Sequence, residues 1–187
     1  RLAACSPSRV TARRSPLAAA IARRLLARRQ SVPEWDLERG GYRIVSAGTG
    51  CLHGAPATPE AEASAIARGL DISGHRAQPL TPSLLEEADE VFVMTTAQRA
   101  SILEFWPDAR DRVRLLDRRN RDIPDPYGHG PAAYEKVAEG LRGALRERLG
   151  MSQGQLGEVL MASQFSVSCW ETGTKVPCHR SRLMLWA

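Results

Sequence analysis

The sequence predicts an α/β protein in which parallel strands alternate with helices that cover both faces of one sheet. Short apolar segments typical of buried strands recur along the chain, and segments with helical periodicity and clear start signals lie between them. Strands joined through helices run parallel by right-handed crossovers, so helices are expected on both sides of the sheet. Ligands bind to such sheets beyond the carboxyl ends of the strands, near the topological switch point.

Four strands are expected, and the first of them is clipped by the start of the chain. They lie at residues 1–4, 42–50, 89–96 and 112–117. The expected helices span residues 16–30, 58–70, 81–88, 97–107 and 131–149. Three of them open on a hydroxyl residue followed by proline, with Ser15, Thr58 and Thr81 as the expected N-caps. A loop rich in proline and glycine occupies residues 121–130.

Composition favours one ordinary globular domain with a small appendage. The chain has 187 residues, of which 43% are apolar and 25% are charged, so disorder is not expected. The net charge of +5 rests on 26 lysine and arginine residues, and only Lys136 and Lys175 are lysines. Arginine on a surface can attract phosphate groups, although a GC-rich gene explains the bias more simply.

The cysteines and the hydropathy pattern argue against several classes of protein. Four scattered cysteines show no metal-ligand spacing and are too few for a disulfide framework, so neither zinc nor another cofactor is expected. No apolar run approaches the ~18 residues that cross a bilayer, and no signal peptide is visible. We therefore expect a cytoplasmic protein without a membrane partner.

The segment RVTARRSPLAAAIARR at residues 9–24 ends as a phosphate-binding loop does. A loop that runs into a helix N-terminus presents backbone N–H groups and the positive end of the helix dipole. Arg14 in such a loop can hold two phosphate oxygens at once. A cysteine at the base of the loop would be held as a thiolate by the same field and could attack phosphorus.

The loop at residues 121–130 supplies the candidate for a proton donor. Asp125, in the segment DPYG, follows the fourth expected strand and therefore lies at the same edge of the sheet as Arg14. A carboxylic acid there could protonate the oxygen that leaves phosphorus. Tyr127 could line the mouth of the site and stack on an aromatic substrate. Taken alone, Asp-Pro is more often an ordinary turn.

Together these segments resemble one family. RRSPLAAAIARRLL, SAGTG, GLDISGHRAQPLTPSLLEEADEVFVMT, VRLLD and DIPDPYGHGPAAYEKVAEGLRGALRERL occur in the order and spacing of the low-molecular-weight protein tyrosine phosphatases. The resemblance covers residues 1–149. It implies a flavodoxin-like three-layer sandwich with a four-stranded parallel sheet. It also implies hydrolysis of phosphotyrosine, or of phosphoarginine in some bacterial members, through a cysteinyl-phosphate and without a metal. Related enzymes with this loop reduce arsenate.

The resemblance assigns roles to individual residues. Arg14 matches the arginine that grips phosphate, and Ser15 matches the hydroxyl residue that hydrogen-bonds the thiolate. Asp125 matches the general acid, and Tyr127 matches the aromatic wall. Residues 46–49 match the turn that supports the phosphate loop. Arg13 and Tyr127 are expected to contact the substrate, which is a phosphorylated protein or a small phosphoester or oxyanion.

The nucleophile is where the chain departs from the family. The family pattern places a cysteine six positions before the arginine, which here is Ser8. Cys5 lies three residues earlier, and a loop with three extra residues is not expected to aim every N–H at one phosphate. Val10 and Thr11 also replace a Gly-Asn pair whose glycine permits positive φ. An altered, inactive domain and a reading-frame slip in the gene both explain these departures, so the activity stays open.

The C-terminal segment carries a second signal. Residues 141–177 resemble the helix-turn-helix of phage-repressor-like regulators, and we expect an extension at 150–187 apart from a phosphatase-like domain at 1–149. The second helix would enter a major groove, with its first residues facing the bases: Gln164, Phe165, Ser166 and Ser168. A plain helical hairpin is the simpler interpretation. The two functional hypotheses are thus a phosphatase and a DNA-binding regulator on an inactive phosphatase-like body. A repressor-type C-terminal segment would favour a dimer.

Overall fold

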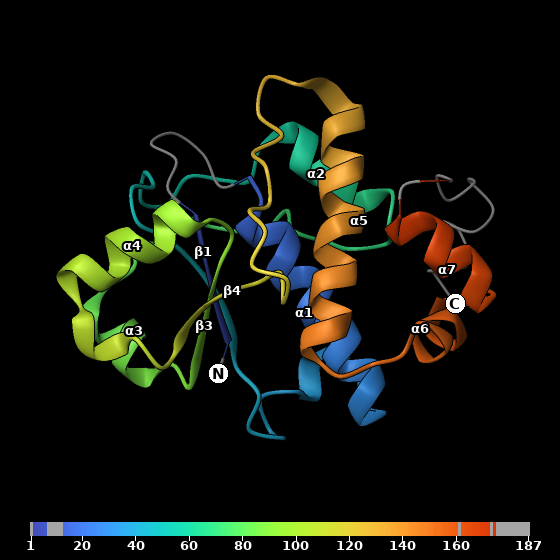
Figure 1. The fold of residues 1–187 in the computed structure, drawn as a ribbon, viewed down its shortest axis with the longest axis horizontal. Coiled ribbons are helices and arrows are strands. Elements are labelled where there is room, and N and C mark those ends of the chain that lie inside the picture. Colours follow the sequence, from blue (N-terminus) through green and yellow to red (C-terminus); the bar gives the residue numbers. More distant parts are fainter. Residues whose placement is uncertain (1, 7–12, 161, 173, 175–187) are drawn as a thin grey trace.

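The computed structural model describes residues 2–6, 13–160, 162–172 and 174, and its centre is one parallel sheet (Figure 1). The strand order is β2-β1-β3-β4. β1 (Leu2–Ser6) pairs with β2 (Ile44–Gly48) and β3 (Glu90–Val93), and β3 pairs with β4 (Val113–Leu115). The chain therefore starts in the middle of the sheet and builds outward on both sides, as in doubly wound folds.

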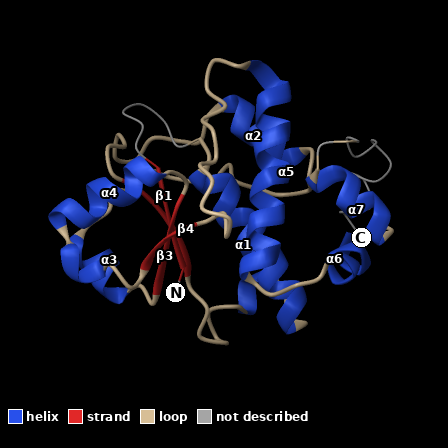
Figure 2. Ribbon diagram, viewed as in Figure 1, coloured by secondary structure: helices blue, strands red, loops and turns tan. Residues whose placement is uncertain are grey.

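Helices cover both faces of this sheet, as the alternation of strands and helices predicted. Figure 2 shows α1 and α5 on one side of the strands and α3 and α4 on the other. The helices have these bounds: α1 Ser15–Gln30, α2 Pro59–Ile66, α3 Pro82–Glu87, α4 Thr96–Phe105, α5 Gly130–Arg148, α6 Gln153–Leu160 and α7 Gln164–Glu171. Two short 3-10 turns occupy Glu34–Asp36 and Pro107–Ala109.

The hydroxyl caps are confirmed at two of the three predicted helix starts. The Thr58 hydroxyl accepts from the N–H of Ala61, and the Thr81 hydroxyl accepts from the N–H of Leu84. The prediction for Ser15 is wrong, because Ser15 is already the first helical residue and Arg14 is the N-cap without a side-chain cap bond. The carbonyl of Arg14 accepts the first intrahelical bond instead, from Ala18. The helix thus starts one residue earlier and holds Arg14 at its mouth.

Strand alternation divides the core into two layers. In β3, Val91 and Val93 point to one face, where they pack with Ile102 and other residues of the α3–α4 side. Phe92 and Met94 belong to the opposite cluster, which contains the apolar residues of α1 and α5. Apolar side chains fill both layers beside the strands.

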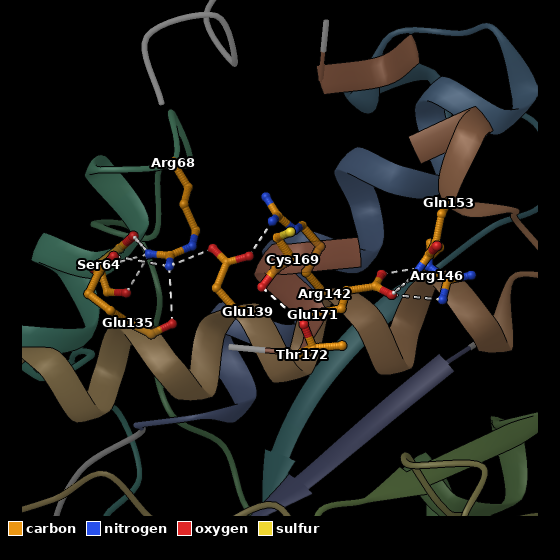
Figure 3. Close-up of polar contacts among 10 residues, drawn as sticks. All are labelled: Ser64, Arg68, Glu135, Glu139, Arg142, Arg146, Gln153, Cys169, Glu171 and Thr172. Atoms are coloured by element: carbon orange, nitrogen blue, oxygen red, sulfur yellow. Dashed lines mark hydrogen bonds and ion pairs between the residues drawn. The ribbon is translucent and has the colours of Figure 1, made fainter. Parts of the chain in front are cut away.

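The C-terminal helices α6 and α7 pack against this body. Leu156 of α6 and Val167 of α7 are fully buried, and both belong to the same core cluster as α1 and α5. Figure 3 shows Arg146 of α5 and Glu171 of α7 pointing toward each other, with Gln153 beside them. Nε and Nη2 of Arg146 donate to the two carboxylate oxygens of Glu171 at 2.6 and 3.0 Å. The hydrophobic core therefore continues across residue 150.

A second polar network on α5 ties it to the segment after α2. Arg68 donates to Ser64, to both carboxylate oxygens of Glu135, and to Glu139, which also accepts from Arg142 (Figure 3).

Among the helices that the structure describes, none is long and apolar enough to cross a membrane.

Candidate active site

The carboxyl ends of β1 and β2 meet where the phosphate loop was predicted. Ser6 pairs with Gly48, and Cys5 pairs with Ala47 and with Val93 of β3. Cys5 is therefore the next-to-last residue of the central strand β1. Ser8, Val10 and Thr11 lie outside the described residues. The chain re-enters the described structure at Arg13 and continues directly into α1.

The predicted supporting turn lies at the end of β2. Ser46 is buried in the strand, and its carbonyl accepts from the Gln78 side chain at 3.1 Å. The backbone N–H of Gly48 donates to the carbonyl of Gln78 at 2.9 Å. Residues 46–49 are thus fixed beside the end of β1. Ser15 is also buried, in the first turn of α1.

The acid loop is held in place by β3 and α4. The N–H of Ile123 donates to the carbonyl of Met94, the residue after β3, at 2.8 Å. The Asp122 carboxylate accepts from both the backbone N–H and the hydroxyl of Thr96, at the start of α4. Asp122 and Ile123, which lie three and two residues before Asp125, are therefore both anchored by hydrogen bonds. The sheet edge and one helix N-terminus together position the acid.

Arg14 and Asp125, predicted from distant parts of the chain, come together here. Arg14 is only 3% exposed, and its Nη1 donates to the carbonyl of Ile123. Its Nη2 lies 3.8 Å from Oδ2 of Asp125. The other carboxylate oxygen, Oδ1, accepts from the backbone N–H of Tyr127 at 3.3 Å. The loop at residues 122–127 thus orients both Arg14 and Asp125, the residues predicted to bind phosphate and to donate a proton.

Arg13 is the neighbour that connects the acid to the aromatic residue. Its Nη1 donates to Oδ2 of Asp125 at 3.2 Å. Its guanidinium carbon lies 3.5 Å from the centroid of the Tyr127 ring, which is a cation–π contact. Tyr127 itself is 55% exposed. One ring face is therefore covered by Arg13 at the mouth of the site, as far as the described residues show.

Two guanidinium groups lie within ion-pair distance of one carboxylate, because Arg13 and Arg14 both contact Asp125. Burial lowers the pKa of the Arg14 guanidinium, Asp125 and Asp122 raise it, and Arg13 lowers it. In addition, Nε of Arg13 and Nε of Arg14 are buried and find no hydrogen-bond partner within the described part of the chain. Both arginines have donors left for an oxyanion.

Sequence reasoning missed the residues that hold the acid loop. Asp122 and Ile123 act through a cap on α4 and through main-chain bonds, and these contacts depend on how the loop folds back on β3. The sequence offered two signals for this contact: an acidic residue, Asp122, in the loop, and two threonines at the start of α4. The described residues contain no cluster of three or more histidine, cysteine or acidic side chains that could hold a metal.

The residues predicted to read DNA lie apart from this site, on α7. Gln164 and Phe165 are exposed, whereas Ser166 and Ser168 are half-buried. Glu171, the last residue of α7, is bound by Arg146 and Gln153. The two predicted helices are therefore present, and the Ser152 hydroxyl caps α6 by accepting from Gln155. DNA binding by α7 stays a prediction without support from these contacts.

Comparison with known proteins gives a consistent result. The family model of low molecular weight phosphotyrosine protein phosphatase matches residues 9–153. The probable low molecular weight protein-tyrosine-phosphatase EpsP of Ralstonia nicotianae is 40% identical over 127 residues, which is 67% of this chain and 79% of the relative. The protein-arginine-phosphatase of Geobacillus stearothermophilus is 29% identical over 140 residues, 73% and 85% of the two chains.

A solved structure agrees with the sequence comparisons. The tyrosine phosphatase Wzb from Escherichia coli K30, in complex with sulphate, superposes with a TM-score of 0.67 at 26% identity, covering 80% of this chain and 95% of that one. Fold and site therefore define a phosphatase-type α/β protein. The chain belongs to the low molecular weight phosphotyrosine protein phosphatase family. The match begins at residue 9, after both Cys5 and Ser8.

Proposed function

We propose that this protein hydrolyses phosphorylated side chains of proteins, with phosphotyrosine as the main substrate. The observation that carries the proposal is the buried Arg14 guanidinium at the N-terminus of α1, 3.8 Å from the carboxylate of Asp125. A phosphate-binding arginine beside a proton donor is what phosphoryl transfer to a cysteine requires. Membership of the family supports the same reaction.

The first step transfers the phosphoryl group to the enzyme. A thiolate attacks phosphorus, so that an S–P bond forms and the P–O bond to the tyrosine breaks. Asp125 in its protonated form gives its proton to the leaving phenolate oxygen. Arg14 and the N–H groups at the start of α1 stabilise the charge on the equatorial phosphate oxygens.

The second step releases phosphate. Asp125, now a carboxylate, accepts a proton from a water molecule that attacks phosphorus. The S–P bond breaks and the thiolate is regenerated. The same residue therefore acts as acid and then as base, without a metal or an external reductant.

We assign the nucleophile to Cys5 rather than to Ser8. Cys5 is in the central strand β1, whose carboxyl end faces the start of α1 and the turn at residues 46–49. A thiol is readily ionised at the N-terminus of a helix, whereas the helix field cannot bring a serine hydroxyl near neutrality.

Arg13 regulates access to Asp125 in this proposal. Its ion pair with Asp125 at 3.2 Å and its contact with Tyr127 place the Arg13 guanidinium between the acid and the aromatic ring. A bound phosphate competes for Arg13, which frees Asp125 and exposes the ring face of Tyr127. The ring then stacks on the phosphotyrosine side chain.

The test is phosphate release from a phosphotyrosine peptide. The wild-type chain is expected to release phosphate, Arg14→Ala is expected to release none above background, and Arg43→Ala is a matched control at an exposed ion pair with Glu87. Absence of release by the wild-type chain at any enzyme concentration would contradict the proposal. Equal rates for wild type and Arg14→Ala would also contradict it.

Phosphoarginine is the second candidate substrate. The contact of Arg13 with Tyr127 and Asp125 favours it, because it places a guanidinium over the ring and beside the carboxylate, as a substrate arginine would be placed. A relative that is named a protein-arginine-phosphatase supports it as well. Release of phosphate from a phosphoarginine peptide, with kcat/KM compared against phosphotyrosine, decides between the two.

Arsenate reduction and DNA binding are weaker candidates. No contact in the described part of the chain favours either of them, and the family match ends at residue 153, before α7. Salt-dependent binding of duplex DNA that disappears on truncation after Gly150 would revive the DNA hypothesis.

A further inference from the structure

A cleft of about 790 Å³ lies along the outer edge of the sheet, and neither Arg14 nor Asp125 lines it. It is formed by β4, the edge strand, together with α4 and the end of α5. Five arginines line it: Arg99, Arg110, Arg114, Arg118 and Arg148. A volume of this size is typical of sites for small molecules.

Two of these arginines are fixed by the strand edge itself. Nε of Arg99 donates to the carbonyl of Val113 at 3.0 Å. Arg148 donates from Nη2 to the carbonyl of Leu115 and from Nε to the carbonyl of Leu116, the latter at 3.0 Å. Outward-facing carbonyls of an edge strand are thereby covered by side chains, which also protects the edge from pairing with another strand. The remaining N–H groups of both guanidinium groups have no described partner.

Main-chain carbonyls hold two further arginines. Arg114 donates to the carbonyl of Asp111 from Nε and Nη2, at 3.4 and 3.3 Å. Arg118 donates to the carbonyl of Glu147 at 3.2 Å. These bonds position the guanidinium groups and leave their positive charge in place, because a carbonyl carries no net charge.

The cleft is therefore strongly positive. Within the described residues, none of the five arginines forms an ion pair with a carboxylate, although many arginines elsewhere in the chain do, as Arg68 and Arg146 show. Asp111 is the one acidic residue that lines the cleft, and it contributes its carbonyl. Burial lowers the pKa of Arg148, Arg118 and Arg114 lower it further, and Glu90 and Asp117, which do not line the cleft, raise it in part. Like charges that are held together in this way are relieved by a bound anion.

We propose that this cleft is a second anion site, which binds a small ligand with two or more linked phosphate groups. A single phosphate can engage two arginines, so five arginines around one cleft match a longer phosphate chain. Inorganic polyphosphate and the phosphate chain of a nucleotide share this chemistry. The proposal does not depend on the hydrolytic activity, because none of the five arginines is assigned to it; Thr96, which also lines the cleft, is shared with the acid loop through its bonds to Asp122.

The test is calorimetric titration of the full chain with inorganic tripolyphosphate, in an Arg14→Ala background that disables the phosphate-binding arginine of the active site. The double variant R110A/R114A is expected to weaken binding at least about 10-fold, since two charges that contact the ligand are lost. Arg39→Ala, an exposed arginine elsewhere, is the charge-matched control and should leave binding unchanged. Asp111→Asn should tighten binding by removing the only carboxylate of the cleft.

A second titration with adenosine 5′-triphosphate separates the two sources of the phosphate chain. Tighter binding than tripolyphosphate identifies a nucleotide, and equal or weaker binding identifies polyphosphate. Both results support the site if R110A/R114A weakens them. No binding at millimolar tripolyphosphate, or equal binding by R110A/R114A and the Arg39→Ala control, overturns the proposal. Circular dichroism of each variant verifies that the exposed substitutions leave the fold intact.

Discussion

Arg14 and Arg146 are both buried arginines that bind a main-chain carbonyl and a carboxylate, but they differ in how completely they are engaged. Arg146 uses Nε and Nη2 on Glu171 and donates from Nη1 to the carbonyl of Met151 at 2.6 Å. Arg14 binds the carbonyl of Ile123, lies 3.8 Å from Asp125, and keeps a buried Nε without a described partner. A fully bonded arginine stabilises the fold, whereas one with donors to spare can bind an anion.

The cleft arginines extend this comparison. Four of the five are positioned by carbonyls, and none of the five has a carboxylate partner within the described residues, so their positive charge is available to an anion. Three of them, Arg110, Arg114 and Arg118, are exposed, so water solvates their charges until a ligand binds. The degree of unmet hydrogen bonding therefore separates structural arginines from those proposed to bind phosphate.

The largest expected effect is on activity, at Arg14. Arg14→Lys keeps the charge but loses the planar fork that can hold two phosphate oxygens and the carbonyl of Ile123. We expect kcat/KM for p-nitrophenyl phosphate to fall by about 10³-fold, while the melting temperature changes little. Retention of activity in the lysine variant would show that point charge alone is sufficient.

A smaller loss of activity is expected at Asp125. Asp125→Asn can still bond to Arg13 but cannot deliver a proton to the leaving oxygen, so kcat should fall by about 10²-fold for a phosphotyrosine peptide. The loss should be smaller for p-nitrophenyl phosphate, whose leaving group needs less protonation. Equal losses for both substrates would mean that Asp125 acts by position and not as an acid.

We expect the opposite pattern when the Arg146–Glu171 ion pair is broken: the protein should lose stability and keep its activity. Glu171→Gln leaves Arg146 buried without its carboxylate, which should lower the free energy of unfolding by about 3 kcal/mol in chemical denaturation. The double variant R146M/E171L, which removes both charges, is the control and should lose less. Loss of catalysis in Glu171→Gln at full folding would break the distinction between the two arginines.

The smallest expected effect is the pH dependence of stability at His75. Burial lowers the pKa of His75 below its usual value of 6.5, and Arg23 and Arg76 lower it further. The folded state therefore favours the neutral imidazole, so this contribution to stability is present above pH 6.5 and is lost as the pH falls toward the folded pKa. His75→Gln should flatten the melting temperature between pH 7.5 and 5. An unchanged slope would assign the acid sensitivity to other groups.

Local sequence signals predicted the strands and helices because the conformation of each segment depends mainly on residues close to it in the chain. Thr58 and Thr81 start helices as expected, and Arg14 and Asp125 meet because both follow from the order of parallel strands. The pairing of Arg13 with Asp125 could not be predicted, since it depends on how two loops fold together. The arginine cleft assembles from residues between positions 99 and 148 and has no local signature.

The C-terminal pattern shows the same limit in a different way. The resemblance to a helix-turn-helix correctly predicted two helices in this segment, which are α6 and α7. Glu171, the last residue of α7, forms an ion pair with Arg146 of α5. The sequence pattern therefore indicates the local helices more reliably than it indicates a DNA-binding function.

Cys5 is proposed to act as the nucleophile beside Arg14 and Asp125. The most direct measurement compares the turnover of a phosphotyrosine peptide by Cys5→Ser and Ser8→Ala, with trapped phosphoenzyme mapped by mass spectrometry. We predict that Cys5→Ser has no turnover, that Ser8→Ala turns over like the wild type, and that the phosphoryl group is found on Cys5. Activity in Cys5→Ser together with its loss in Ser8→Ala would contradict the assignment.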